Sequence, residues 1–107
     1  MERVTSIDQL KAGDKIARVW NGEIKIIEFL CRHPHNKEYS LFLNSTYDGM
    51  PKFYNKRLVE EKWYLFTGTN EDWDEVYTMR IEDMQDSLNR WKEYREIQRK
   101  KHKQELS

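Results

Sequence analysis

The dipeptide Asn21-Gly22, which lies between two stretches of alternating apolar and polar residues, constrains the fold more than any other feature of the chain. Both residues tolerate positive φ, so the pair is a strong signal for a two-residue β-hairpin turn. Residues 15–20 alternate with period two before the turn, and residues 23–32 supply the returning strand. The sequence therefore predicts an antiparallel hairpin over 15–32.

The returning strand changes phase in its middle. Ile24 and Ile26 share one face of an extended chain, whereas Ile27, Phe29 and Cys31 share the other. A one-residue change of phase is typical of a β-bulge, which bends the strand. We therefore expect a bulge near Ile26 and a sheet that curls.

Turn residues divide the next part of the chain into short strands. Pro34 and Asn36 predict a loop over 33–37, and Asp48-Gly49 predicts a further turn. The intervening stretches predict strands over 38–44, 52–59 and 62–67. The charged middle of the 52–59 strand favours a position at the edge of the sheet.

The C-terminal part of the chain predicts a long helix. Acidic residues precede basic ones from Glu82 to Lys103, as the helix dipole prefers. We expect Met84, Leu88 and Trp91 to pack this helix on the sheet, with its basic end projecting. Residues 75–80 have strand propensity, but Tyr77 and Arg80 also fall on a helical stripe from Trp73 to Trp91. We favour a strand to Arg80 and a helix over 82–103.

These elements predict one α+β domain, mainly β, over residues 1–107. A capping box at Ser6–Gln9 indicates a short N-terminal helical turn. Residues 14–80 would form a small antiparallel meander or barrel of five to six strands, with the helix following. The opening segment Leu10–Ile16, with its Gly-Asp turn, resembles the start of small SH3-like barrels.

Composition bounds the class of protein. Charged residues make up 36% of the chain, but 4 Trp, 6 Tyr and 4 Phe can anchor a thin core. The single cysteine, Cys31, rules out an internal disulfide and fits a reducing compartment. Residues 1–6 lack the apolar stretch of a signal peptide, and no apolar run is long enough to span a bilayer. We expect a cytoplasmic protein without a membrane segment.

Charge is balanced overall but unevenly placed. The formal net charge is zero. Residues 60–88 carry nine acidic and two basic side chains, whereas residues 89–107 carry seven basic and three acidic ones. Whole-molecule attraction to nucleic acid or membranes is therefore not expected. The basic tail beside an acidic segment offers a charge polarity that a partner could use, although solvated charge on a helix is the commoner explanation.

Residues with the potential for chemistry are few. Cys31, His33 and His35 would project to one side of an extended chain and offer three ligands to a soft metal. Pro34 interrupts that extended path, and a fourth ligand is missing nearby. The sequence offers no phosphate-binding loop and no recognisable nucleophile–base pair. We therefore expect no enzyme activity and no cofactor, with metal binding or catalysis as a distant third hypothesis.

Aromatic and basic residues mix around residues 52–64, which is typical of single-stranded nucleic-acid binding. The residues concerned are Lys52, Phe53, Tyr54, Lys56, Arg57, Lys62 and Tyr64. Since alternation places Phe53 and Tyr54 on opposite faces, at least one of them belongs to the core. A nucleic-acid-binding small β-barrel is therefore the alternative hypothesis.

The aromatic excess favours recognition of another protein, because Trp, Tyr and Arg dominate interface hot spots. Our leading hypothesis is a small non-enzymatic accessory, adaptor or inhibitor module. The candidate contact residues are Tyr47, Tyr54, Tyr64, Trp73, Lys52, Lys56 and Arg57. A homodimer is a further hypothesis, with a helix seam of Trp91, Tyr94 and Ile97.

Overall fold

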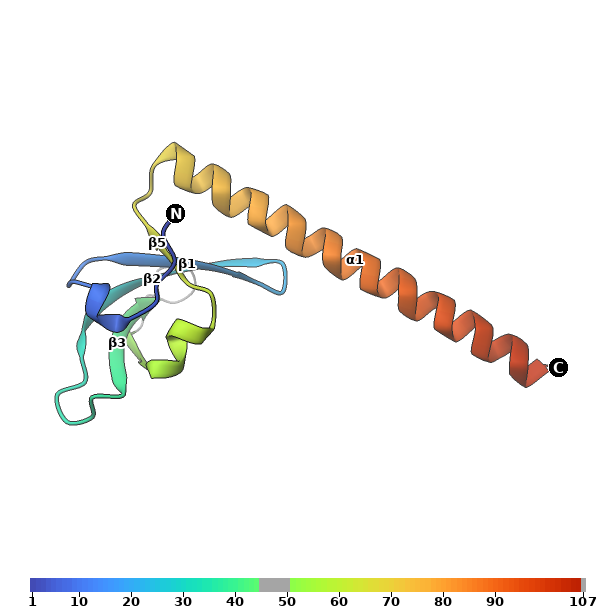
Figure 1. Cartoon of the computed structure of the whole chain (residues 1–107), viewed down its shortest axis with the longest axis horizontal. Helices are drawn as coiled ribbons and strands as arrows, with labels where there is room; N and C mark the ends of the chain where they lie inside the picture. The colour runs from blue at the N-terminus through green and yellow to red at the C-terminus, as the bar shows by residue number, and fades with distance from the viewer. Residues whose placement is uncertain (45–50, 107) are drawn as a thin grey trace.

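The computed structural model describes residues 1–44 and 51–106. It confirms an α+β fold with an antiparallel five-stranded sheet, a short N-terminal 3₁₀ turn and a long C-terminal helix (Figure 1). The strands are β1 (Lys15–Trp20), β2 (Glu23–Arg32), β3 (Tyr39–Asn44), β4 (Pro51–Asn55) and β5 (Tyr64–Phe66). The helical elements are η1 (Ile7–Gln9), η2 (Lys56–Glu60) and α1 (Asn70–Leu106).

The predicted hairpin is confirmed as β1 and β2. Asn21 and Gly22 both have positive φ, 56° and 75°, as a two-residue turn between twisted strands requires. The register is regular from Lys15 opposite Glu28 to Trp20 opposite Glu23. This hairpin forms the centre of the sheet, whose strand order is β4-β3-β2-β1-β5.

The structure has an irregularity in β2, but not near Ile26, where the bulge was expected. Pairing of β1 with β2 is continuous there, and the register instead shifts between Phe29 and Cys31, opposite β3. The change of apolar phase has another cause, which is that both faces of the sheet are covered. Ile27 belongs to the core on one face, and Ile26 packs on the other.

Two clusters therefore stabilise the sheet, one on each face. The larger one consists of Val4, Leu10, Ile16, Ile27, Phe29, Phe42, Leu58 and Trp63. The smaller one consists of Ala17, Phe66 and Val76, with Met1, Val19, Ile24, Ile26 and Trp73 packed around it. The smaller cluster joins α1 to the sheet.

The strand predicted over 52–59 ends early. β4 stops at Asn55, whose Oδ1 accepts the backbone N–H of Arg57 at 3.0 Å and so caps η2. This turn buries Leu58 in the larger cluster. The predicted edge position of the strand is confirmed, whereas the predicted Asp48-Gly49 turn lies outside the described residues.

β5 is a three-residue edge strand that pairs with β1 and leaves the strand order open. It is shorter than the predicted strand 62–67. The N-terminal segment extends this edge, because the Val4 N–H donates to the Trp63 carbonyl at 2.8 Å and the Leu65 N–H donates to the Glu2 carbonyl at 2.7 Å. The capping box that starts η1 is present as predicted, with Ser6 and Gln9 reciprocally bonded.

The strand favoured up to Arg80 is wrong, because residues 70–80 form the first turns of α1. The Thr69 hydroxyl accepts the Asp72 N–H at 3.2 Å, and the Asp72 carboxylate accepts the Thr67 N–H at 2.7 Å. These bonds start the helix twelve residues before the predicted position. Val76, only 1% exposed, then packs on the sheet, so tertiary contact overrides its strand propensity.

Candidate functional site

The first part of α1 is held on the β1–β2 hairpin. Trp73 packs edge-on against Phe66, with ring centroids 5.0 Å apart. Farther along the helix, Arg80 Nε donates to the Gly22 carbonyl at 2.9 Å, and the Asp83 carboxylate accepts the Gly22 N–H at 2.7 Å. The helix is therefore bonded to the hairpin turn at both backbone groups of one residue.

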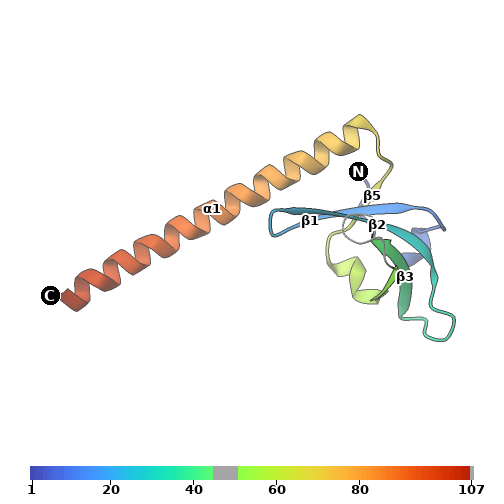
Figure 2. The same ribbon diagram turned by 180° about the vertical axis from the view of Figure 1, so that it is seen from behind.

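Beyond this turn the helix runs away from the sheet (Figures 1 and 2). The predicted packing of Met84, Leu88 and Trp91 on the sheet is wrong, since each is more than half exposed. The reason is length. The 37 residues of α1 span about 55 Å, whereas the six residues of β1 span only about 20 Å.

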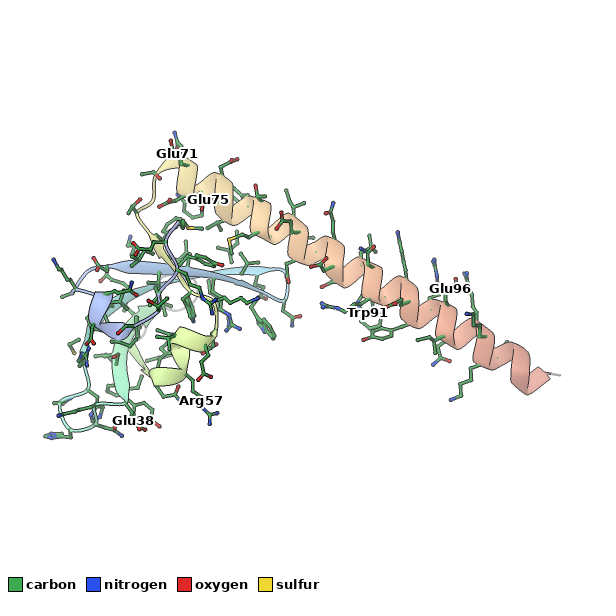
Figure 3. The ribbon with its side chains drawn as sticks, viewed as in Figure 1. Glu38, Arg57, Glu71, Glu75, Trp91 and Glu96 are labelled. Atoms are coloured by element: carbon green, nitrogen blue, oxygen red, sulfur yellow. The ribbon has the colours of Figure 1, made fainter. Side chains whose placement is uncertain are left out.

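The exposed side of α1 carries a continuous apolar row, which we call the helix stripe and which begins over the sheet and continues beyond it. It consists of Tyr77, Ile81, Met84, Leu88 and Trp91. Successive members are four, three, four and three residues apart, so they follow one side of the helix. Trp91 is 70% exposed and lies past the tip of the hairpin (Figure 3).

The predicted seam residues adjoin the end of the stripe. Tyr94 and Ile97 are exposed, as is Trp91 itself. The rings of Trp91 and Tyr94 meet edge to face with centroids 5.8 Å apart. The structure therefore brings two of the three predicted residues into contact on one exposed surface.

Charge divides α1 into two unlike parts. Residues 70–87 carry seven acidic side chains and one basic one, and residues 88–106 carry seven basic side chains and three acidic ones. Asp72 sits at the acidic end, where hydrogen bonds from the Thr67 side chain and backbone lower the pKa of its carboxyl. The Met1 ammonium donates to Glu75 in the same region, and this bond raises the pKa of the ammonium. The helix stripe thus crosses from an acidic to a basic surface.

The candidate aromatics in the sheet region are half-buried. Tyr54 packs against Phe42 and Trp63 of the larger cluster, with ring centroids 5.6 and 6.5 Å away. Trp73, in the first turn of α1, is half-buried against the smaller cluster, and Tyr64 is half-buried in β5. Of the basic candidates, Lys52 and Arg57 are exposed, while Tyr47 and the Lys56 side chain lie outside what the structure describes.

A partly exposed aromatic patch, of which the nucleic-acid hypothesis named only Phe53, lies at the opposite end of the sheet. Phe53 on β4 is 55% exposed, and its ring lies 4.9 Å from that of His33, which in turn lies 6.5 Å from Tyr39. Alternation required that Phe53 and Tyr54 face opposite ways, but it did not say which one was outside. Trp20, near the tip of the hairpin, is also exposed. The guanidinium carbon of Arg18 lies over the Trp20 ring, 4.8 Å from the ring centroid.

The metal candidates are not assembled into a site. Within residues 1–44 and 51–106, no three His, Cys, Asp or Glu side chains are grouped to hold a metal ion. The Nδ1 atom of His33 accepts the backbone N–H groups of His35 and Asn36, at 3.0 and 2.9 Å. His33 therefore shapes its loop, and Cys31 is exposed on β2.

In comparison with known proteins, no family model, curated protein or solved structure matches this chain. Within the part of the chain that the structure describes, α1 and the other helices are not apolar enough to cross a membrane.

Proposed function

We propose that this protein is a small non-enzymatic module that binds another protein through the helix stripe. One observation supports this above all others: five large apolar side chains, each more than half exposed, line a helix that runs past its own sheet. Contiguous apolar surface of this kind marks interaction sites in soluble proteins. Burial of the stripe in a partner would supply the driving force for binding.

The chemistry of the stripe fits recognition by an amphipathic helix. Anchors at successive helical turns are the standard arrangement for a helix that lies in an apolar groove or against another helix. Tyr77 and Trp91 are residue types that dominate binding energy at interfaces. The change from acidic to basic charge along α1 would orient the partner.

The remaining fold is the scaffold in this proposal. We propose a curled, SH3-like sheet, supported by the pairing of the last strand with the first. We also propose a cytoplasmic location, which the exposed thiol of Cys31 supports because such thiols persist in reducing compartments.

The proposal is tested by a photo-crosslinking amino acid placed at Trp91, with the same group placed at Glu93 as a matched control. Position 93 is exposed but lies about 160° around the helix from the centre of the stripe. We expect one specific covalent protein adduct from position 91 and none from position 93. Equal labelling from both positions, or no protein adduct from either, would contradict the proposal.

The second candidate function is binding of single-stranded nucleic acid, and one observation favours it. Phe53 and Tyr39 are exposed, with the half-buried ring of His33 beside both, on a sheet edge that also carries Lys52, and Arg57 follows in η2. Bases stack on such rings, and the cations would contact phosphates. This candidate predicts oligonucleotide binding that weakens steeply with salt and is lost in Phe53→Ala but kept in Trp91→Ala.

A further inference from the structure

We infer that the partner of the helix stripe is a second copy of this chain, with the two α1 helices paired antiparallel. The inference rests on the proposed function, because it names the occupant of the same surface. Three properties of α1 support it: the spacing of the stripe, the charge of its two parts, and the direction in which the stripe faces.

The spacing of the stripe is that of a helix–helix seam. From Tyr77 to Trp91 the steps of four and three residues average three and a half, which is the repeat that keeps apolar residues facing a partner helix. A helix that packs on a sheet instead shows a broader apolar face. The stripe therefore has the geometry expected for pairing with another α-helix.

Charge selects the second copy and the antiparallel orientation. Because residues 70–87 are strongly acidic and residues 88–106 strongly basic, α1 is complementary to itself when reversed. A parallel pair would place acidic part against acidic part and basic part against basic part. Antiparallel pairing instead joins opposite charges at both ends of the seam.

The stripe defines the register of the pair. With the twofold axis between Met84 and Leu88, Leu88 of one copy lies opposite Met84 of the other, and Trp91 lies opposite Ile81. The same register places Arg95 opposite Tyr77, where a guanidinium can lie on the ring. The twofold axis repeats each of these contacts, so both copies contribute the same helix stripe to the interface.

The sheet does not obstruct this pairing. Successive residues are rotated by about 100° around a helix, which places the centre of the stripe about a quarter of a turn or slightly more from Val76. Val76 faces the sheet and is buried there, whereas the stripe is exposed. One helix can therefore pack on its own sheet and on a second helix together.

The dimer is tested by sedimentation equilibrium of the full chain over a range of concentrations. We expect a reversible monomer–dimer equilibrium whose Kd rises by at least about tenfold in Leu88→Glu. The matched control is Asn89→Glu, which adds the same charge at an exposed position off the stripe. Equal Kd values for the two variants would overturn the inference.

The orientation is tested by disulfide trapping in a Cys31→Ser background. A mixture of Ile81→Cys and Trp91→Cys chains should yield the mixed disulfide, and each variant alone should yield little. Added salt should also weaken the dimer, because the paired charges attract. Disulfides within each single variant, or a dimer that tightens with salt, would show a parallel pair and contradict the inference.

The photo-crosslinking experiment separates failure of this inference from failure of the proposed function. A position-91 adduct between two copies of the chain supports both. A monomer at every concentration whose position-91 adduct contains a different protein overturns the second-copy inference and leaves the proposed function standing. A monomer without an adduct overturns both.

Discussion

The part of α1 that lies over the sheet and the part that runs beyond it have the same backbone but unlike surroundings. Over the sheet, Val76 and Trp73 are packed, and two side chains bond to Gly22. Beyond Met84 the apolar side chains are exposed, up to Trp91 at 70%. The first part stabilises the fold, whereas the second part adds little to the folded core and presents a surface.

The largest expected difference is between two tryptophans. Trp63, 1% exposed, belongs to the larger cluster, so Trp63→Ala should lower the free energy of unfolding by about 3–5 kcal/mol. Trp91→Ala should change it by less than about 0.5 kcal/mol, because the side chain is exposed. Urea denaturation of dilute, monomeric protein measures both, and similar losses would erase the distinction between the two regions.

A smaller difference is expected within α1 itself. Val76→Ala removes buried methyl groups between helix and sheet and should cost about 2 kcal/mol. Ile81→Ala, at an exposed position five residues later, should cost less than about 0.5 kcal/mol in the monomer. Thermal unfolding by circular dichroism compares the two variants, and an equal loss would mean that the stripe is covered in the monomer.

Whether a feature of the fold could be predicted from the sequence depends on whether local or long-range interactions determine it. The hairpin was predictable because Asn21-Gly22 and period-two alternation are local signals. The start of α1 was not, because Val76 suits a strand, and its contact with the smaller cluster acts together with the Thr69–Asp72 hydrogen bond to fix it in a helix.

The candidate site was predictable in part for the same reason. Helical spacing identified Trp91, Tyr94 and Ile97 as a seam, and all three are exposed. The same spacing led us to place Met84, Leu88 and Trp91 on the sheet, which is wrong. An apolar row indicates that one face of a helix packs against another surface, but it does not indicate which surface. The exposed ring of Phe53 depended on the twist and pairing of β4, which alternation alone does not specify.

The hydrogen bonds to Gly22 mark the boundary between the two parts of α1. Asp83→Ala removes the acceptor for the Gly22 N–H and should cost about 1 kcal/mol. Asp86→Ala, one turn later and exposed, is the matched control and should leave stability within about 0.5 kcal/mol. Urea denaturation compares the two variants. Identical denaturation curves would mean that the part of α1 held on the sheet ends before Asp83.

The smallest expected effect is a pH dependence at the start of α1. The pKa of Asp72 is lowered in the folded chain, so its ionised form stabilises the fold above the unfolded pKa, and this contribution is lost as pH falls through the folded pKa. Asp72→Asn should therefore reduce Tm near neutral pH and flatten its acid dependence. A Tm–pH profile that retains the wild-type slope would argue against this role of Asp72.

The most direct test of the division between the two parts is a ¹⁹F spectrum of the chain labelled with 5-fluorotryptophan, recorded on dilution in H₂O and in D₂O. Single Trp→Phe variants assign the signals. We predict that the Trp63 signal is insensitive to the solvent isotope at every concentration, whereas the Trp91 signal becomes sensitive as the protein is diluted. A Trp91 signal that stays insensitive in the monomer would show that α1 folds back on its own sheet and would contradict the account.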